Sequence, residues 1–146
     1  MVSAGQTILG LDPGVRTGVA IYVLGRLQTL RTIPPDQIGS EIAAVFGLDG
    51  IVYQDSRQGT VWTTHRNPRA ALKMARNFGE IDGGCRMIVQ AAERLGVPAL
   101  GVSPRQKGRK LDAGELCTLT GWAGRSNQHE RDAAAVAWPY RSGWKR

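Results

Sequence analysis

The alternation of apolar and polar positions predicts three short strands near the N-terminus. Residues 7–11, 17–23 and 27–32 are rich in apolar or β-branched side chains and are separated by turn residues. The link at 12–14 reads Asp-Pro-Gly, which is a typical turn sequence because proline restricts φ and glycine tolerates positive φ. Since the connections are short, we expect these strands to form an antiparallel meander.

A helix and a fourth strand are predicted next. Ile38, Ile42, Val45 and Phe46 fall on one face of a helix that the following glycine would end. Residues 51–53 form a short apolar run that indicates a strand. A helix between the meander and this strand favours a crossover to a parallel neighbour.

A long helix is predicted over residues 68–95. It begins with Asn-Pro, a cap residue followed by proline in the first turn, and ends before Gly96. Gly79 and Gly83 belong to a stripe of small and apolar residues that recurs every four positions. A second helix could therefore approach closely along this stripe; a kink is the alternative.

The remaining elements complete an α/β pattern. A fifth strand (97–102), a basic loop (105–110) and two helices (112–119 and 127–138) precede a basic tail, 141–146, that we expect to fray. This order predicts a mixed five-stranded sheet flanked by helices. At 146 residues, the whole chain 1–146 is expected to form a single domain.

Composition narrows the function. The chain has 19 Lys and Arg against 12 Asp and Glu, a net charge of +7 and a pI near 10.1. A basic globule favours a polyanionic partner such as nucleic acid, although a merely solvated basic surface is the alternative. No apolar run approaches the ~20 residues of a membrane span, and we expect no secretory leader. Cys85 and Cys117 are expected to be small buried residues in a reducing compartment, which favours a cytoplasmic location.

Four residues could form a metal site. Asp12 and Asp55 follow strands, and ligand sites in α/β sheets favour the carboxyl ends of strands. His129 and Asp132, three residues apart, share one face of the last predicted helix. Oxygen ligands with one imidazole suit Mg²⁺ or Mn²⁺, and two such ions can hydrolyse a phosphodiester. The alternatives are that Asp12 is a turn residue and that Asp55 caps a loop.

Basic residues gather in two segments that follow predicted strands. Residues 57–76 hold five Arg or Lys and no acid, and residues 105–110 hold four in six. Spaced charges of this kind neutralise phosphates without reading sequence. Trp62 could stack on an unpaired base, or it could fold back onto the core. The predicted DNA contacts are Arg57, Trp62, Arg66, Arg69, Lys73, Arg105, Lys107, Arg109 and Lys110.

Several segments together resemble one nuclease family. Residues 10–20 (GLDPGVRTGVA) look like the first-strand signature of the RuvC-like Holliday junction resolvases, which belong to the RNase H-like nuclease superfamily. Residues 129–133 (HERDA) resemble the final acidic helix of that family. Residues 79–98 resemble its glycine-containing helix and the strand after it, and residues 103–107 resemble the segment with an accessory lysine.

The resemblance implies an RNase H-like fold, a homodimer, and cleavage of four-way or otherwise branched DNA with two Mg²⁺ or Mn²⁺ ions per active site. Asp12, His129 and Asp132 match metal-binding catalytic positions, and Lys107 matches the accessory lysine. The glycine stripe of the long helix is the candidate dimer interface. The chain is shorter than typical bacterial members and is similar in length to phage-encoded ones, whose location would be the host cytoplasm.

One position departs from the family pattern. The family usually carries Glu at the end of the fourth strand, where this chain has Gln54 and then Asp55. We expect Asp55 to take the catalytic position because glutamine is a poorer metal ligand. A slip of one residue along the strand would place Gln54 there instead. Two other functions stay open: a broader nuclease for flaps, forks or RNA, and a nucleic-acid-binding module without catalysis.

Overall fold

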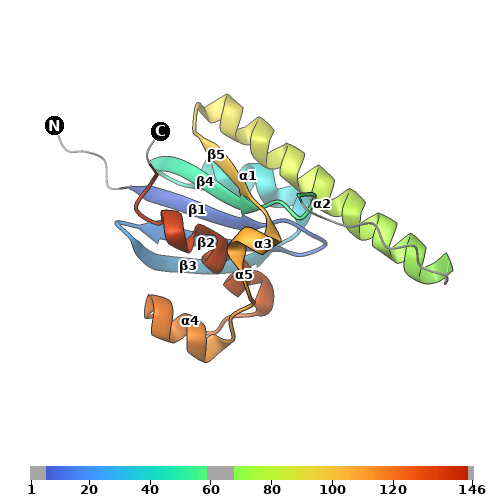
Figure 1. Ribbon diagram of the computed structural model, residues 1–146. Coiled ribbons are helices and arrows are strands. Elements are labelled where there is room, and N and C mark those ends of the chain that lie inside the picture. Colours follow the sequence, from blue (N-terminus) through green and yellow to red (C-terminus); the bar gives the residue numbers. More distant parts are fainter. Residues whose placement is uncertain (1–5, 59–67, 145–146) are drawn as a thin grey trace.

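The predicted strands form one mixed sheet with the order β3-β2-β1-β4-β5 (Figure 1). This computed structural model describes residues 6–58 and 68–144. β1 pairs antiparallel with β2, and β2 with β3, whereas β1–β4 and β4–β5 are parallel. The predicted α/β class is confirmed. The strands are β1 (Thr7–Asp12), β2 (Thr17–Val23), β3 (Arg26–Ile33), β4 (Leu48–Gln54) and β5 (Ala99–Val102).

Helices cover both faces of the sheet. α1 and the long α2 pack on one face, and α5 packs on the other (Figure 1). Within the described ranges, no helix is both long and apolar enough to cross a membrane. The helices are η1 (Pro35–Gln37), α1 (Ile38–Ala44), α2 (Pro68–Leu95), α3 (Pro104–Lys107), α4 (Ala113–Thr120), α5 (Gln128–Ala137) and η2 (Trp138–Tyr140).

Strand alternation divides the core into two layers. Leu9 and Leu11 of β1 are buried against α1 and α2, whereas Ile8 is buried in the layer that contains α5. Because successive side chains alternate between the faces, Asp12 falls on the α5 face. In β4, Val52 is buried on the α5 side and Tyr53 on the α2 side.

Two glycines let α5 lie directly on the sheet. A Cβ atom at Gly18 would be 1.9 Å from the carbonyl oxygen of His129, and one at Gly10 would be 2.4 Å from that of Ala133. Any side chain at either position would displace the helix. This contact therefore brings the first turns of α5 over the end of β1.

Hydrogen bonds hold α5 at this position. The buried hydroxyl of Tyr22 donates to the carbonyl oxygen of Ala134 at 2.7 Å. At the start of the helix, the Asn127 side chain accepts from the backbone N–H of Glu130, and the Glu130 carboxylate accepts from that of Asn127. The Asn127 amide also donates to the Thr32 hydroxyl of β3 at 2.7 Å. The capping box thus ties the helix start to the sheet.

Three local expectations were wrong. Cys117 of α4, expected to be buried, is exposed, whereas Cys85 is buried as expected. The helix expected to include Phe46 ends at Ala44, and Phe46 is 97% exposed. Val45 is extended and Gly47 has φ +65°, so the chain turns at once into β4, which begins earlier than expected. The basic segment 105–110, expected as a loop, begins within the short helix α3, which has a complete capping box.

The close contact of α5 can be tested with Gly18→Ala. The added methyl group meets backbone atoms that cannot move without shifting α5, so we expect unfolding free energy to fall by about 3 kcal/mol, the upper end of typical overpacking costs. Urea unfolding measures the change. Gly39→Ala in α1, where an added Cβ atom would meet nothing within 4 Å outside its own helix turn, is the control and should be neutral or slightly stabilising. Equal stability of Gly18→Ala and the native protein would contradict this packing.

Candidate active site

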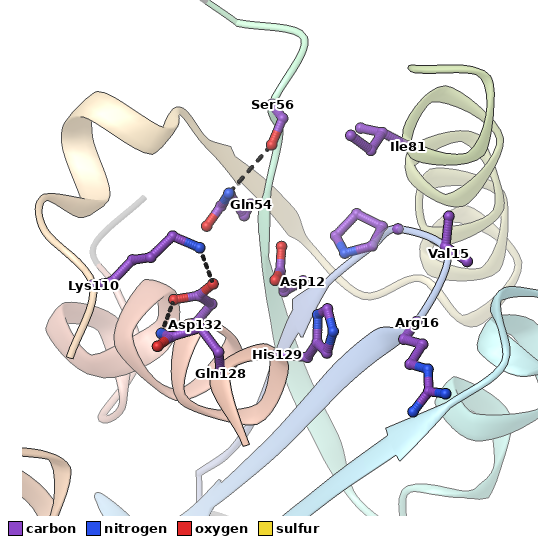
Figure 2. Close-up of a pocket in the computed structure, with 12 residues that line it drawn as sticks. Asp12, Val15, Arg16, Gln54, Ser56, Ile81, Lys110, Gln128, His129 and Asp132 are labelled. Carbon is purple, nitrogen blue, oxygen red and sulfur yellow. Dashed lines mark hydrogen bonds and ion pairs between the residues drawn. The ribbon is translucent and has the colours of Figure 1, made fainter. Parts of the chain in front are cut away.

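A hollow of about 500 Å³ opens where the carboxyl ends of β1 and β4 meet the first turns of α5 (Figure 2). Strand ends supply Asp12 and Gln54, and the β1–β2 turn (13–16) forms one wall. Ser56, Ile81 of α2 and Lys110 close the sides. The lining residues from α5 are Gln128, His129 and Asp132.

Strand register explains why Asp12 and Gln54 meet. β1 and β4 are parallel, and Leu11 pairs with Tyr53. Asp12 and Gln54 are the next residues on the two strands, and both fall on the α5 face. α5 adds His129 and Asp132 to the same space, so three of the four predicted metal-site residues line one hollow.

Asp12 is half-buried, in a setting that disfavours its charge. Burial raises the pKa of Asp12 from 3.8 to about 7, and the nearby Asp132 carboxylate adds to the increase. Lys107 and Lys110 act in the opposite direction. A buried carboxylate with a raised pKa is typical of a site that a cation can stabilise.

Asp132 is the most heavily contacted carboxylate of the hollow. Lys107 Nζ lies 3.1 Å from its Oδ1, and Lys110 Nζ lies 3.4 Å from its Oδ2. Gln128 Nε2 also donates to Oδ1 at 2.9 Å. The Lys107 side chain is only 4% exposed, so its ion pair is buried. The predicted accessory lysine thus lies beside a predicted metal ligand.

Gln54 faces the hollow with an unpaired oxygen. Its Nε2 donates to Ser56 Oγ at 3.2 Å, and its Oε1 points away from Ser56 (Figure 2). Within the described part of the chain, this buried Oε1 has no hydrogen-bond partner. An unsatisfied buried acceptor is unfavourable, which indicates that another group completes the site.

Asp55 does not lie in this hollow, contrary to expectation. It follows Gln54 on the opposite face of the sheet, 4% exposed. Arg57 Nε lies 2.8 Å from Asp55 Oδ1, and its Nη2 lies 2.9 Å from Oδ2; this contact holds the pKa of Asp55 below its usual value. Arg57 also reaches Asp82 of α2 at 2.9 Å. The position beside Asp12 therefore belongs to Gln54, and Asp55 anchors the segment after β4 to α2.

The donors in the hollow suit a hard cation. Among the described residues, no three His, Cys, Asp or Glu side chains form a metal-binding cluster. The Gln54 carbonyl supplies a further oxygen beside the carboxylates of Asp12 and Asp132, and His129 lines the same space. Carboxylate and amide oxygens are typical ligands of Mg²⁺ and Mn²⁺. The orphaned Gln54 oxygen and the disfavoured Asp12 charge both fit such an ion.

Part of the predicted DNA-binding set borders the hollow. Arg69 and Lys73 line a second hollow on α2, together with Arg76, Leu72 and Glu80. Val15 of the β1–β2 turn lines both hollows, so the two are adjacent. We call the hollow on α2, with Arg69, Lys73 and Arg76, the basic channel; it lies next to the hollow that holds Asp12.

The other predicted DNA contacts differ in placement. Arg105 is exposed at α3, and Lys110 is exposed beside Asp132. Arg57 is paired with two carboxylates, and Arg109 is paired with Glu115. Trp62 and Arg66 lie outside the described residues. Arg16 and Gln128 also line the hollow, and the sequence analysis does not identify them. The signal that could have indicated them is their closeness in sequence to Asp12 and His129.

The sheet order, the parallel β1–β4 pair and the helix across β1 define an α/β fold of the RNase H-like class. More specifically, the fold is RuvC-like. The chain is similar to Thermus thermophilus RuvC in complex with a Holliday junction substrate, with a TM-score of 0.64 and 18% identity over 92% of each chain. It is also similar to another Thermus thermophilus RuvC structure, with a TM-score of 0.65 and 14% identity over 92% of this chain and 93% of that one. No protein-family model matches the sequence, and the curated proteins include no match.

The burial of Asp12 predicts a pH-dependent stability in the metal-free protein. With a folded pKa of about 7 and an unfolded value of 3.8, the folded chain binds more protons between these limits, so stability falls as pH rises across this window. Asp12→Asn removes this contribution. In the presence of a chelator, its stability relative to the native protein should rise by roughly 2–4 kcal/mol from pH 4 to pH 8. Urea unfolding over that range tests this; a difference that does not change with pH would contradict it.

Proposed function

We propose that this protein is a metal-dependent endonuclease that cleaves four-way DNA junctions. The observation that supports it most is the gathering of Asp12, His129 and Asp132 in one hollow at the carboxyl end of a RuvC-like sheet. One of the similar structures is a RuvC in complex with a Holliday junction substrate. The net charge of +7 is consistent with a nucleic-acid substrate, and we expect a cytoplasmic location with the DNA.

The residues of the hollow would have different roles in cleavage. Asp12 and Asp132 would hold Mg²⁺ or Mn²⁺, with His129 and Gln54 in the same space. Two such ions, when bound, supply an activated water and stabilise the leaving oxygen. The buried ammonium group of Lys107 pairs with Asp132 and can orient that carboxylate, and the exposed Lys110 on its other oxygen can contact a phosphate. Asp55, which we expected to be a ligand, instead positions the chain after Gln54 through Arg57.

The basic channel would guide the DNA backbone to the hollow. Arg69 and Lys73 lie on α2, and Lys110 lies at the opposite side of Asp12. These side chains can contact phosphates on both sides of the cleaved bond, which selects for backbone geometry and not for base sequence. Binding should therefore weaken strongly as salt rises.

A homodimer is the assembly we propose. A Cβ atom at Gly79 or Gly83 would meet no atom within 4 Å, so the outward face of α2 is open there. A second copy packed on α2 at Gly79 and Gly83 would present two hollows to strands related by a two-fold axis. Paired, symmetric nicks in a junction are the expected result.

Asp12→Asn should abolish cleavage and retain binding. A fixed four-way junction with labelled arms, in Mg²⁺ or Mn²⁺, should be cut at symmetric positions by the native protein. The variant should cut it at least about 100-fold more slowly. Asp36→Asn, the same change at an exposed residue of η1, is the control and should cut normally.

The same assay separates the alternatives. A linear duplex and a flap are tested beside the junction. Equal cutting of the flap would favour a broader branch nuclease. Tight junction binding without cutting would favour a binding module without catalysis. A neutral Gln54 in place of a charged metal ligand would also be consistent with that function. Undiminished cutting by Asp12→Asn would contradict the proposal.

The basic channel generates a separate prediction. Replacing both Arg69 and Lys73 with alanine should weaken junction binding and reduce the slope of log affinity against log salt by about 2, because two phosphate contacts are lost. Fluorescence anisotropy over a salt series measures both quantities. Arg26→Ala combined with Arg94→Ala removes the same charge from exposed positions outside the channel and should leave the slope nearly unchanged. Equal slopes for the two double variants would exclude the channel as the DNA path.

A further inference from the structure

Gln54 faces the hollow with a side chain whose effect on cation binding the proposed function leaves open. Its Oε1 is buried and, among the described residues, has no hydrogen-bond partner. Its Nε2 is held by Ser56 Oγ at 3.2 Å, so the amide is oriented with the oxygen toward the hollow (Figure 2). This orientation places a neutral oxygen next to Asp12. A glutamate at position 54 would place a negatively charged oxygen there instead.

The charge balance around Gln54 is unusual for a cation site. Among the described residues of the hollow, the carboxylates are Asp12 and Asp132. Lys107 and Lys110 both contact Asp132, and Arg16 lines the same space. Lys110 and Arg16 thus match the two carboxylates in number, and the buried Lys107 adds a third positive charge beside Asp132. The Gln54 amide adds an oxygen without adding negative charge, so a divalent ion gains little Coulomb attraction from the protein alone.

A DNA phosphate would supply the missing charge. The basic channel, which Arg69 and Lys73 line, adjoins the hollow at Val15, so a DNA backbone bound along it would pass close to Asp12. A phosphate oxygen placed there adds a further hard oxygen and the negative charge that the glutamine position lacks. It also offers the exposed Lys110 a second anion besides Asp132.

We propose that DNA and the divalent cation bind this hollow cooperatively, with the Gln54 carbonyl as the neutral protein ligand that makes the cation depend on a DNA phosphate. This inference rests on the proposed function, because it concerns the same hollow. The free protein holds the cation weakly, and cation and DNA each raise the affinity of the other by the same factor. The protein therefore binds the cation needed for cleavage only when its DNA substrate is bound.

The first test measures Mn²⁺ binding without DNA, by the loss of the free Mn²⁺ signal in electron paramagnetic resonance. Gln54→Glu adds the absent charge and should bind Mn²⁺ at least tenfold more tightly than the native protein. Gln54→Leu should bind it more weakly than the native protein. Gln90→Glu makes the same change of charge on an exposed face of α2 and should match the native protein. If Gln54→Glu binds Mn²⁺ no more tightly than Gln90→Glu, the inference is overturned.

The second test measures the coupling from the DNA side. The affinity for a fluorescent four-way junction is measured by anisotropy in EDTA and in Ca²⁺ at constant ionic strength. The native affinity should rise at least fivefold with Ca²⁺, and this increase should disappear in Gln54→Leu, whose fold is checked by urea unfolding. An equal increase in native protein and Gln54→Leu, or none in the native protein, overturns the inference.

Asp12→Asn distinguishes failure of the proposed function from failure of the role proposed for Gln54. If Asp12→Asn cuts junctions and binds Mn²⁺ as the native protein does, the proposed function fails and the inference fails with it. If cleavage and Mn²⁺ binding need Asp12 but are insensitive to Gln54→Leu and Gln54→Glu, the proposed function stands and only the role of Gln54 is wrong.

Discussion

The candidate site depends on the direct contact between α5 and the glycines of β1 and β2. A Cβ atom at Gly18 would lie 1.9 Å from the His129 carbonyl oxygen, so the helix backbone rests on the strands with no side chain between them. That distance sets where His129 and Asp132 stand relative to Asp12. A helix displaced by the thickness of one methyl group would move both residues away from the strand ends, and the hollow would lose its shape.

The contact brings together groups that are unfavourable when left alone. Burial raises the pKa of Asp12, Asp132 needs Lys107 and Lys110, and the oxygen of Gln54 is unsatisfied among the described residues. Packing of apolar layers on both faces of the sheet stabilises the fold against these costs. Such a concentration of unfavourable polar groups is typical of a functional site. A cation and a phosphate would relieve each of them.

Local sequence signals predicted the order of elements and most of the site. Proline and glycine marked the ends of α2, and the resemblance to a nuclease family placed Asp12, His129 and Asp132 together. The choice between Gln54 and Asp55 could not be made in the same way. β4 is a central parallel strand whose residues 51–53 are buried on both faces, so its sequence lacks the polar alternation that would reveal which face each side chain occupies.

The central claim is that Asp12 and Gln54, not Asp55, border the cation site. Anomalous scattering from Mn²⁺ in crystals of the protein bound to a four-way junction would locate the ion directly. The account predicts a Mn²⁺ peak within ligand distance of an Asp12 carboxylate oxygen and of Gln54 Oε1, with a DNA phosphate beside it. A peak at Asp55, or a peak at Asp12 from which Gln54 is turned away, would contradict it.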